Sequence, residues 1–233
     1  MQRRRVLRHF LGLPAAAGAL SLAAPLLRAQ TSKWPEKTVR IVAAGPAGAS
    51  ADIAARLLAD QLTRQIGQPV IVEPKAGAGG VLAVNDLSLA PRDGHTLLVG
   101  VSSLVSEIPH ILKLPIVMAN EIKPIVEVAR GGLVLVGNPS FPAKTLPELV
   151  AYVKANPGKV NFASYQAGTL SHVEGLLLNK AAGIDMTHVG YKGSTPALQD
   201  LMGGHVQLMF DGMATSIPLI KGGKIKAFGV STP

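Results

Sequence analysis

Residues 39–66 read VRIVAAGPAGASADIAARLLADQLTRQI, and this stretch decides the fold. A β-branched apolar run at residues 39–43 passes through a loop of small residues into a helical pattern over residues 51–66. The apolar stripe of that pattern consists of Ile53, Leu57, Leu58, Leu62 and Ile66. A strand, a tight loop and an amphipathic helix in this order predict one unit of a parallel α/β sheet.

The same alternation continues along the chain. Further apolar runs lie at residues 70–72, 96–99, 125–128, 133–136, 160–163, 188–189, 206–210 and 225–230. Residues 145–148 form a capping box for a helix through residue 156, and residues 195–196 are expected to begin a helix that ends at residues 203–204. The pattern predicts parallel α/β sheets with right-handed crossovers, and the least regular segment, residues 102–121, is expected to hold mobile loops.

The loop after the first strand carries the clearest sign of a binding site. Its small residues Ala47, Gly48 and Ala49 would let a ligand approach the backbone closely, and Ser50 is expected to cap the following helix. The first-turn N–H groups then form an anion site that suits a carboxylate as well as a phosphate. Asp52 could contact a cationic or hydroxyl group or only favour the helix dipole. A tight turn that binds nothing is the alternative for these residues.

Three further strand-to-helix loops repeat the theme. Residues 77–80 read GAGG, but Leu82 stands where a dinucleotide fingerprint needs glycine, so that interpretation is weak. Ser102 and Ser103 place two hydroxyls after the third strand. Residues 164–169 form a second small, hydroxyl-rich loop about a hundred residues after the first. Two such loops indicate two lobes that face one ligand.

The N-terminus has the pattern of a secretory signal. Residues 1–8 carry four arginines and no acid, residues 10–27 are almost purely apolar, and a small residue follows at Ala29. Arg3-Arg4-Arg5 also fits a twin-arginine signal. An anchored N-terminal helix is the alternative. We therefore expect residues 1–29 to be a signal peptide and the protein to be exported to a bacterial periplasm.

Removal of the expected signal peptide would lower the net charge of the chain. The formal net charge of +9 falls to +4 without residues 1–29, because 18 basic and 14 acidic residues then remain. The basic balance is therefore poor support for nucleic acid binding, although a mildly positive surface favours anionic solutes. The absence of cysteine excludes disulfides, thiolate metal sites and cysteine catalysis.

Enzyme signatures are mostly missing. The sequence has no Gly-x-Ser-x-Gly elbow, no Walker phosphate loop and no His-Glu-x-x-His motif, so we expect no metal and no cofactor. His172 with Glu174, or His188 with Asp211, could form acid–base pairs, but histidines in such positions more often serve as hydrogen-bonding scaffold.

A series of short motifs occurs along the chain in the same order as in a known protein family. They lie at residues 34–35, 39–42, 48–56, 67–73, 77–80, 93–98, 156–164, 182–183, 188–193 and 200–206, with His172 between them. Together they closely resemble the Bug family, the periplasmic solute receptors of tripartite tricarboxylate transporters. The resemblance covers residues 33–233.

The resemblance implies an α/β fold of the type II periplasmic-binding-protein class, with two lobes around a central cleft. Residues 30–130 would form lobe one, and residues 131–233 would form lobe two with the start of the segment that returns to lobe one. Family members capture small organic acids or acidic amino acids and deliver them to a membrane permease. They are not enzymes, need no cofactor and are expected here to act as monomers without nucleic acid. A sensory receptor on the same fold, or a small α/β enzyme, is the alternative.

The resemblance also implies a set of ligand-binding residues. These are Ala47, Gly48, Ala49, Ser50, Asp52, Ser102, Ser103, Ser164, Gln166, Ala167, Gly168, Thr169 and Asp211. The chain departs from the family pattern in its first loop, which lacks an aromatic and a second glycine, and at Gln166 and Gly190, where glycine and proline are usual. Ligand identity therefore does not transfer. About the last quarter of a family receptor has no counterpart here, so lobe one would be incomplete, and a version extended at the C-terminus is expected to be more stable and to bind better.

Overall fold

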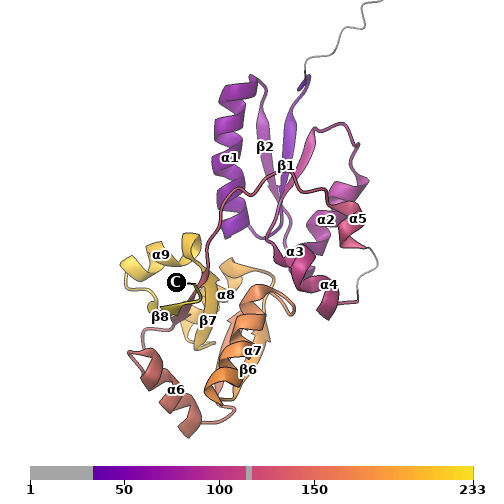
Figure 1. The fold of residues 1–233 in the computed structure, drawn as a ribbon. Coiled ribbons are helices and arrows are strands. Elements are labelled where there is room, and N and C mark those ends of the chain that lie inside the picture. Colours follow the sequence, from indigo (N-terminus) through magenta and orange to yellow (C-terminus); the bar gives the residue numbers. More distant parts are fainter. Residues whose placement is uncertain (1–33, 114–116, 233) are drawn as a thin grey trace, which may run out of the picture. The chain divides into compact units, whose positions relative to one another are not determined.

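The computed structural model describes residues 34–113 and 117–232 (Figure 1), so the expected signal peptide lies outside the described residues. The strands are β1 (Val39–Ala43), β2 (Val70–Pro74), β3 (Thr96–Val99), β4 (Leu133–Gly137), β5 (Val160–Ser164), β6 (Met186–Gly190), β7 (Leu208–Gly212) and β8 (Lys226–Val230). The α-helices are α1 (Ser50–Ile66), α2 (Val81–Leu89), α3 (Ser103–Ser106), α4 (Ile108–Ile111), α5 (Met118–Glu121), α6 (Leu146–Ala155), α7 (Leu170–Ala182), α8 (Ser194–Gly203) and α9 (Met213–Lys221). A 3₁₀ turn, η1 (Ala78–Gly80), precedes α2.

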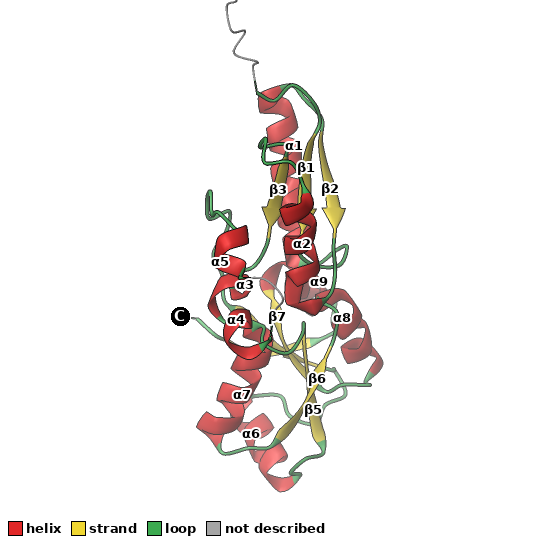
Figure 2. Cartoon of the chain, turned by 90° about the vertical axis from the view of Figure 1, so that its right-hand side faces the viewer, coloured by secondary structure: helices red, strands yellow, loops and turns green. Residues whose placement is uncertain are grey.

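The first sheet is parallel, as the sequence predicts. Its order is β2-β1-β3, with β1 paired in parallel to both neighbours. Ile41 of β1 packs with Ala55 and Ala59 of α1. A separate cluster joins α2 to the short helices that follow β3, through Val84, Leu104 and other residues. Figures 1 and 2 show α1 and α2 on opposite sides of these strands.

The second sheet is mixed rather than fully parallel. Its order is β6-β5-β7-β4-β8; β5 is parallel to β6 and β7, whereas β4 is antiparallel to β7 and β8. The expectation of parallel sheets throughout was therefore wrong for β4. All five residues of β4 are buried. Such a continuous apolar run is equally compatible with either strand direction, so the pattern could not reveal the reversal.

Side-chain alternation in β4 divides the core of the second sheet into two clusters. Leu133 and Leu135 pack on the side that holds α6 and α7, and Val134 and Val136 pack with α8. Period-two alternation is what places neighbouring residues on opposite faces of a sheet. Helices on both faces thus leave the strand ends and their loops to form a site.

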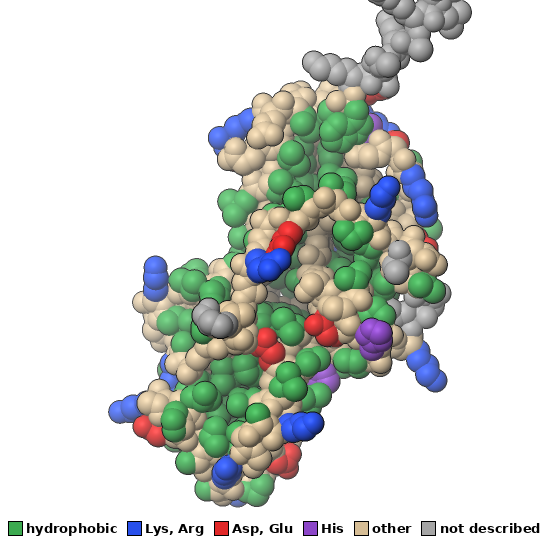
Figure 3. Space-filling model, in the orientation of Figure 1, with side chains coloured by type: hydrophobic (Ala, Val, Ile, Leu, Met, Phe, Trp, Pro, Cys, Tyr) green, Lys and Arg blue, Asp and Glu red, His purple; other side chains and the backbone are tan. Residues whose placement is uncertain are grey.

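The segment between the two sheets differs from its prediction. Residues 125–128, predicted as a strand, are not in one, and Ile125 and Val126 are 79% and 75% exposed. β-Propensity alone does not make a strand where no partner pairs with it. Figure 3, in the orientation of Figure 1, shows apolar side chains exposed at many points on the face that it presents. Residues 102–121, expected to be irregular, hold the short helices α3, α4 and α5, and the expected lobe boundary at residue 130 stays a prediction.

The predicted helix ends are largely confirmed. The Thr145 hydroxyl accepts the Glu148 N–H at 3.3 Å, but the Glu148 carboxylate returns to the Lys144 N–H at 2.8 Å, one residue before the box predicts. Helix α8 begins at Ser194, with Gly193 as its N-cap, rather than at residues 195–196, and Gly204 ends it in the left-handed conformation. Among the described residues, no helix is both long and apolar enough to cross a membrane.

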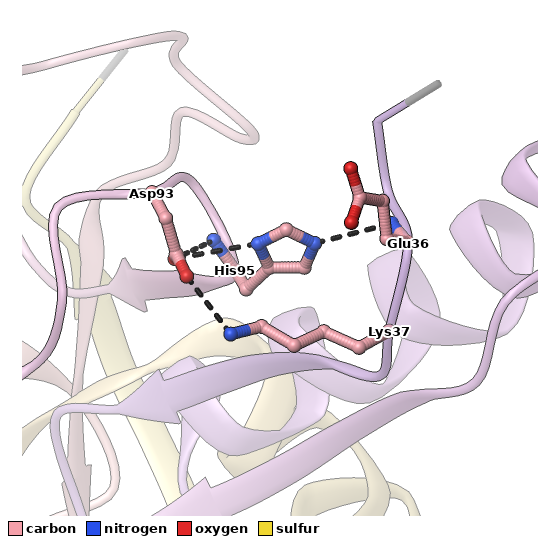
Figure 4. A network of polar contacts seen from close by, with 4 residues as sticks. All are labelled: Glu36, Lys37, Asp93 and His95. Carbon is pink, nitrogen blue, oxygen red and sulfur yellow. Dashed lines mark hydrogen bonds and ion pairs between the residues drawn. The ribbon is translucent and has the colours of Figure 1, made fainter. Parts of the chain in front are cut away.

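A polar network fastens the start of β1 to the turn before β3 (Figure 4). The Asp93 carboxylate accepts hydrogen bonds from the His95 N–H at 3.0 Å and from the Lys37 ammonium at 2.9 Å. The His95 Nε2 accepts the Glu36 N–H at 3.3 Å. The backbone bond from His95 and then the ion pair with Lys37 lower the pKa of Asp93 to about 2.

We expect this network to stabilise the fold above about pH 4 and to be lost as the pH falls towards 2. The sign follows because the folded-state pKa of Asp93 lies below its unfolded value, so the unfolded chain binds the extra proton first. Denaturant midpoints of wild type and Asp93→Asn should therefore differ at pH 6, differ less at pH 2.5 and converge as the pH falls below 2. Asp60→Asn, which removes a carboxylate from an exposed pair on α1, is the control. A wild-type advantage that persists unchanged at pH 2.5 would contradict this role for Asp93.

Candidate functional site

The loop between β1 and α1 has the geometry of a helix N-terminus without a side-chain cap. Ala49 is the N-cap residue, in an extended conformation, and Ser50 is the first residue of α1. The prediction that Ser50 caps the helix was therefore wrong. The first N–H groups of a helix have no acceptor within it, so those of Ser50, Ala51 and Asp52 are available to other acceptors.

Asp52 turns back into this loop instead of facing solvent. One of its carboxylate oxygens accepts both the Gly48 N–H and the Arg56 guanidinium at 2.9 Å, and the residue is 2% exposed. Burial alone would raise the pKa of Asp52, but the bonds from Arg56 and Gly48 outweigh it and lower that pKa. Asp52 thus fixes the turn at Gly48, whose φ of +76° favours glycine.

The other carboxylate oxygen of Asp52 is buried and has no hydrogen-bond partner among the described residues. The hydroxyl of Ser50 is in the same situation. Buried polar atoms without partners are rare and costly. Two of them in the first turn of α1 mark this N-terminus as a place where a further donor or acceptor would be stabilising.

The second candidate loop, residues 164–169, is held by its own hydroxyls. Ser164 is fully buried, and its hydroxyl lies 3.1 Å from the carbonyl of Gln166 and 2.6 Å from Nε2 of His188. The buried Thr169 hydroxyl donates to the same carbonyl at 2.7 Å. Thr169 is the N-cap of α7, and Gln166 and Ala167 are partly exposed. The loop is therefore rigidly shaped, with only its middle open to a ligand.

Asp211, at the end of β7, is fully buried and accepts four hydroxyl hydrogen bonds. Its donors are Tyr165 at 3.0 Å, Ser194 at 2.5 Å, Thr215 at 2.6 Å and Ser216 at 2.5 Å. The charge of Asp211, second to burial, raises the pKa of Tyr165 well above its usual value. These donors come from the loop after β5 and from the starts of α8 and α9, so Asp211 fastens three loops together.

The starts of α8 and α9 lie against the first loop. The Thr195 hydroxyl donates to the Ala47 carbonyl at 2.9 Å. A β-carbon added to Gly212 would collide with the Ser50 hydroxyl, which shows how closely the backbones approach. The N-termini of α1, α8 and α9 therefore meet in one place, and each contributes the positive end of a helix dipole.

The third-strand loop is divided between solvent and core. Ser102 is exposed, and its carbonyl accepts the Ser106 hydroxyl at 2.8 Å, whereas Ser103 is buried as the first residue of α3. Helix α4, which follows α3, packs on the second candidate loop, because a β-carbon added to Gly168 would lie 3.4 Å from Ile111. Exposed Ser102 is the better placed of the two serines for a ligand.

A separate open pocket of about 240 Å³ lies at the other end of the second sheet. Asn138, Phe141, Tyr152, Lys159 and other residues line it, at the starts of β5 and β7 rather than at their carboxyl ends. None of the predicted ligand residues contributes to it. Ligands of open α/β sheets bind outside the carboxyl ends of the strands, so we keep the two loops as the candidate site.

Sequence reasoning placed both loops correctly between a strand and a helix but missed several polar partners. It did not single out Tyr165, Ser194, Thr215 or Ser216, which act only through their contact with Asp211. Of the histidines that it considered for acid–base pairs, Nδ1 of His172 accepts the Gly168 N–H and Nε2 of His188 lies 2.6 Å from the Ser164 hydroxyl. Among the described residues, no group of three or more acidic or histidine side chains could hold a metal ion.

Known proteins resemble this chain over most of its length. Residues 54–232 match the family described as "Tripartite tricarboxylate transporter family receptor". A protein of Cupriavidus necator, "UPF0065 protein in gbd 5'region", is 38% identical over 97% of this chain and 68% of its own length. The "Protein BugT" of Bordetella pertussis is 33% identical over 90% of this chain and 64% of its own length. The chain thus spans about two thirds of the length of these relatives.

Solved structures show the same fold. "Structure of a periplasmic transporter" has a TM-score of 0.82 at 35% identity, covering 86% of this chain and 67% of that one. An R. palustris protein with adipate has a TM-score of 0.82 at 28% identity, covering 85% and 67%. MatC from Rhodopseudomonas palustris, with bound malate, has a TM-score of 0.75 at 31% identity, covering 85% and 68%. The predicted resemblance and the two-sheet α/β fold of periplasmic binding proteins are confirmed.

Proposed function

The chain belongs to the family of tripartite tricarboxylate transporter receptors, and from that premise we propose that it captures a small organic carboxylate and delivers it to a membrane permease. The family consists of solute-binding receptors rather than enzymes. Two structural relatives carry dicarboxylates, adipate and malate. A dicarboxylate, or an acidic amino acid of similar size, is accordingly the ligand class that we propose for this chain.

One observation carries the proposal: α1 and α7 each begin at the end of a parallel strand, with first-turn N–H groups that no side chain caps. Helix N-termini bind anions because their N–H groups point outward and their dipole favours negative charge. Two such ends suit a ligand with a carboxylate at each end. The residues proposed to contact it are Ala47, Gly48, Ala49, Ser50, Ser102, Gln166, Ala167 and Gly168.

Asp52, Asp211 and the buried hydroxyls take a different part in the proposal. Asp52 holds the turn at Gly48, and Asp211 holds the loop after β5 against α8 and α9. Ser103, Ser164 and Thr169 are likewise buried. We assign these residues to positioning the loops rather than to contact with the carboxylate.

Export and partnership complete the proposal. A relative with the same fold is described as a periplasmic transporter, and the N-terminal sequence has the pattern of an export signal. We propose that the protein works in the periplasm as a monomer and needs neither metal nor cofactor. Its partner would be the membrane part of a tripartite tricarboxylate transporter.

A ligand screen by thermal shift tests this function. A compound that binds only the folded state must raise the apparent melting temperature, by an amount that grows with its concentration. We expect malate, adipate or related carboxylates to raise it, and nucleotides and divalent metal ions to leave it unchanged. Stabilisation by nucleotides or metals with none by any carboxylate would overturn the proposal.

A further inference from the structure

Two histidines lie ring to ring behind the second candidate loop. His172 in the first turn of α7 and His188 on β6 have ring centroids 4.1 Å apart, with planes tilted by 42°. The Phe162 ring lies alongside both, stacked on His172 at 6.4 Å and tilted against His188 at 5.2 Å. The two partly buried rings therefore share an apolar neighbour, and two positive charges this close together would repel each other.

Each ring is hydrogen-bonded to the loop itself. Nδ1 of His172 accepts the Gly168 N–H at 3.2 Å, and Nε2 of His188 lies 2.6 Å from the Ser164 hydroxyl. The first bond requires a lone pair on Nδ1, because an N–H cannot donate to a protonated nitrogen. The second can persist in either protonation state, because a hydroxyl both donates and accepts. The protonation state of His172 thus decides whether the loop keeps its tie to α7.

We infer that neutral His172 is a positioning residue for the second ligand loop, and that protonation of the His172–His188 pair releases this loop and weakens carboxylate binding. The inference rests on the proposed function, since it concerns the same loop. It assigns to the two histidines an acid-sensitive control of the site.

Several features keep the pair neutral near pH 7. Burial lowers the pKa of His172, and burial together with the neighbouring His172 lowers that of His188 to about 4. His172 also lies at the positive end of the α7 dipole, which disfavours a further positive charge. Near pH 7 these features favour the uncharged form of both rings.

The other groups around the pair do not oppose this. Phe162 and Ser164 face it from β5, and Gly190 borders His188 on β6. Among the described residues, His172 is the only titratable group that shifts the pKa of His188, and none shifts that of His172. Glu174, the nearest acid on α7, interacts with Ser231 instead. In the part of the chain that the structure describes, no carboxylate shifts the pKa of either ring upward.

The direction of the pH effect follows from linkage. A released loop would let the His172 ring titrate near its ordinary pKa of about 6.5, which lies above its pKa in the ordered loop, so the released state binds more protons than the ordered state as the pH falls through that value. For one proton, release becomes favoured by up to about tenfold for each pH unit between the two pKa values of His172.

Amide exchange in the ligand-free, ¹⁵N-labelled protein tests the inference without any assumption about the ligand. We expect the protection of the Gly168 amide, corrected for the intrinsic exchange rate, to fall at least tenfold between pH 7 and pH 5. His172→Asn should keep the protection at both pH values, because its amide oxygen can accept the same bond and does not titrate. His205→Asn, which changes an exposed histidine in the loop after α8, should behave as wild type. Protection that is constant with pH in wild type, or that falls equally in His172→Asn, would overturn the inference.

Binding of malate and adipate gives the second readout. At pH 7.5, His172→Leu should weaken binding at least tenfold, whereas His172→Asn should bind like wild type. Lowering the pH to 5 should weaken binding more for wild type than for His172→Asn. Protonation of the ligand affects both proteins equally, so the difference between their losses of affinity measures the effect of the His172 ring. Equal losses in the two proteins would contradict the inference. Failure of wild type to bind any carboxylate would contradict the proposed function, while the exchange experiment would still decide the role of His172.

Discussion

Asp211→Ala is expected to lower the free energy of unfolding by about 3 kcal/mol or more, since each buried hydrogen-bonding group left without a partner costs about 1 to 3 kcal/mol. The variant leaves the hydroxyls of Tyr165, Ser194, Thr215 and Ser216 without their acceptor, in a site that is fully buried. Ligand binding should fall as well, because these donors hold the loop after β5 and the starts of α8 and α9 together.

Denaturant unfolding and calorimetry measure the two effects. The control is Asp185→Ala, which removes an exposed acid immediately before β6. It should change the unfolding free energy by less than about 0.5 kcal/mol. If Asp211→Ala does not fold, Asp211→Asn and Thr215→Val supply milder versions of the same loss. A folded Asp211→Ala with the stability of the Asp185→Ala control would show that the hydroxyl cluster contributes nothing.

Gly48→Val is expected to weaken carboxylate binding at least tenfold, equivalent to about 1.4 kcal/mol. Gly48 has a φ of +76°, and its N–H is held by the Asp52 carboxylate. A branched side chain there would strain the turn, displace this bond and cover the approach to the first turn of α1. The left-handed conformation costs an L-residue about 1–2 kcal/mol, so some stability will be lost too.

Gly67→Val separates backbone strain from binding. Gly67 ends α1 with a φ of +68°, and a β-carbon there would meet no atom within 4 Å. It should therefore lose a similar amount of stability and keep its affinity for malate or adipate. Equal affinities for the two variants, measured by calorimetry on folded protein, would place the ligand away from the first loop.

The local pattern of the sequence predicted most of the fold. The apolar stripe in residues 51–66 predicted α1, and the apolar runs at residues 160–163 and 206–210 predicted β5 and β7. The direction of β4 could not be predicted, because it depends on which distant strands pair with it. The exposed run at residues 125–128 shows the converse: an apolar sequence becomes a strand only when a partner is within reach.

The sequence predicted which loops form the candidate site but not which contacts their side chains make. Small residues before a helix indicate an anion site from sequence alone, whereas the bond from Tyr165 to Asp211 joins residues 46 positions apart. Asp52 was expected to face either a ligand or the helix dipole, but its bond to Gly48 is a property of the folded turn. Likewise, His172 and His188 meet only because α7 packs beside β6.

Amide chemical shifts of the ¹⁵N-labelled protein, recorded while malate or adipate is added, test most directly whether backbone N–H groups at helix N-termini bind the carboxylate. The account predicts that the largest changes occur at residues 47–52 and 164–170, with smaller changes elsewhere. Largest changes around the open pocket at residues 138–142, or saturable binding that leaves the amides of both loops unperturbed, would contradict it.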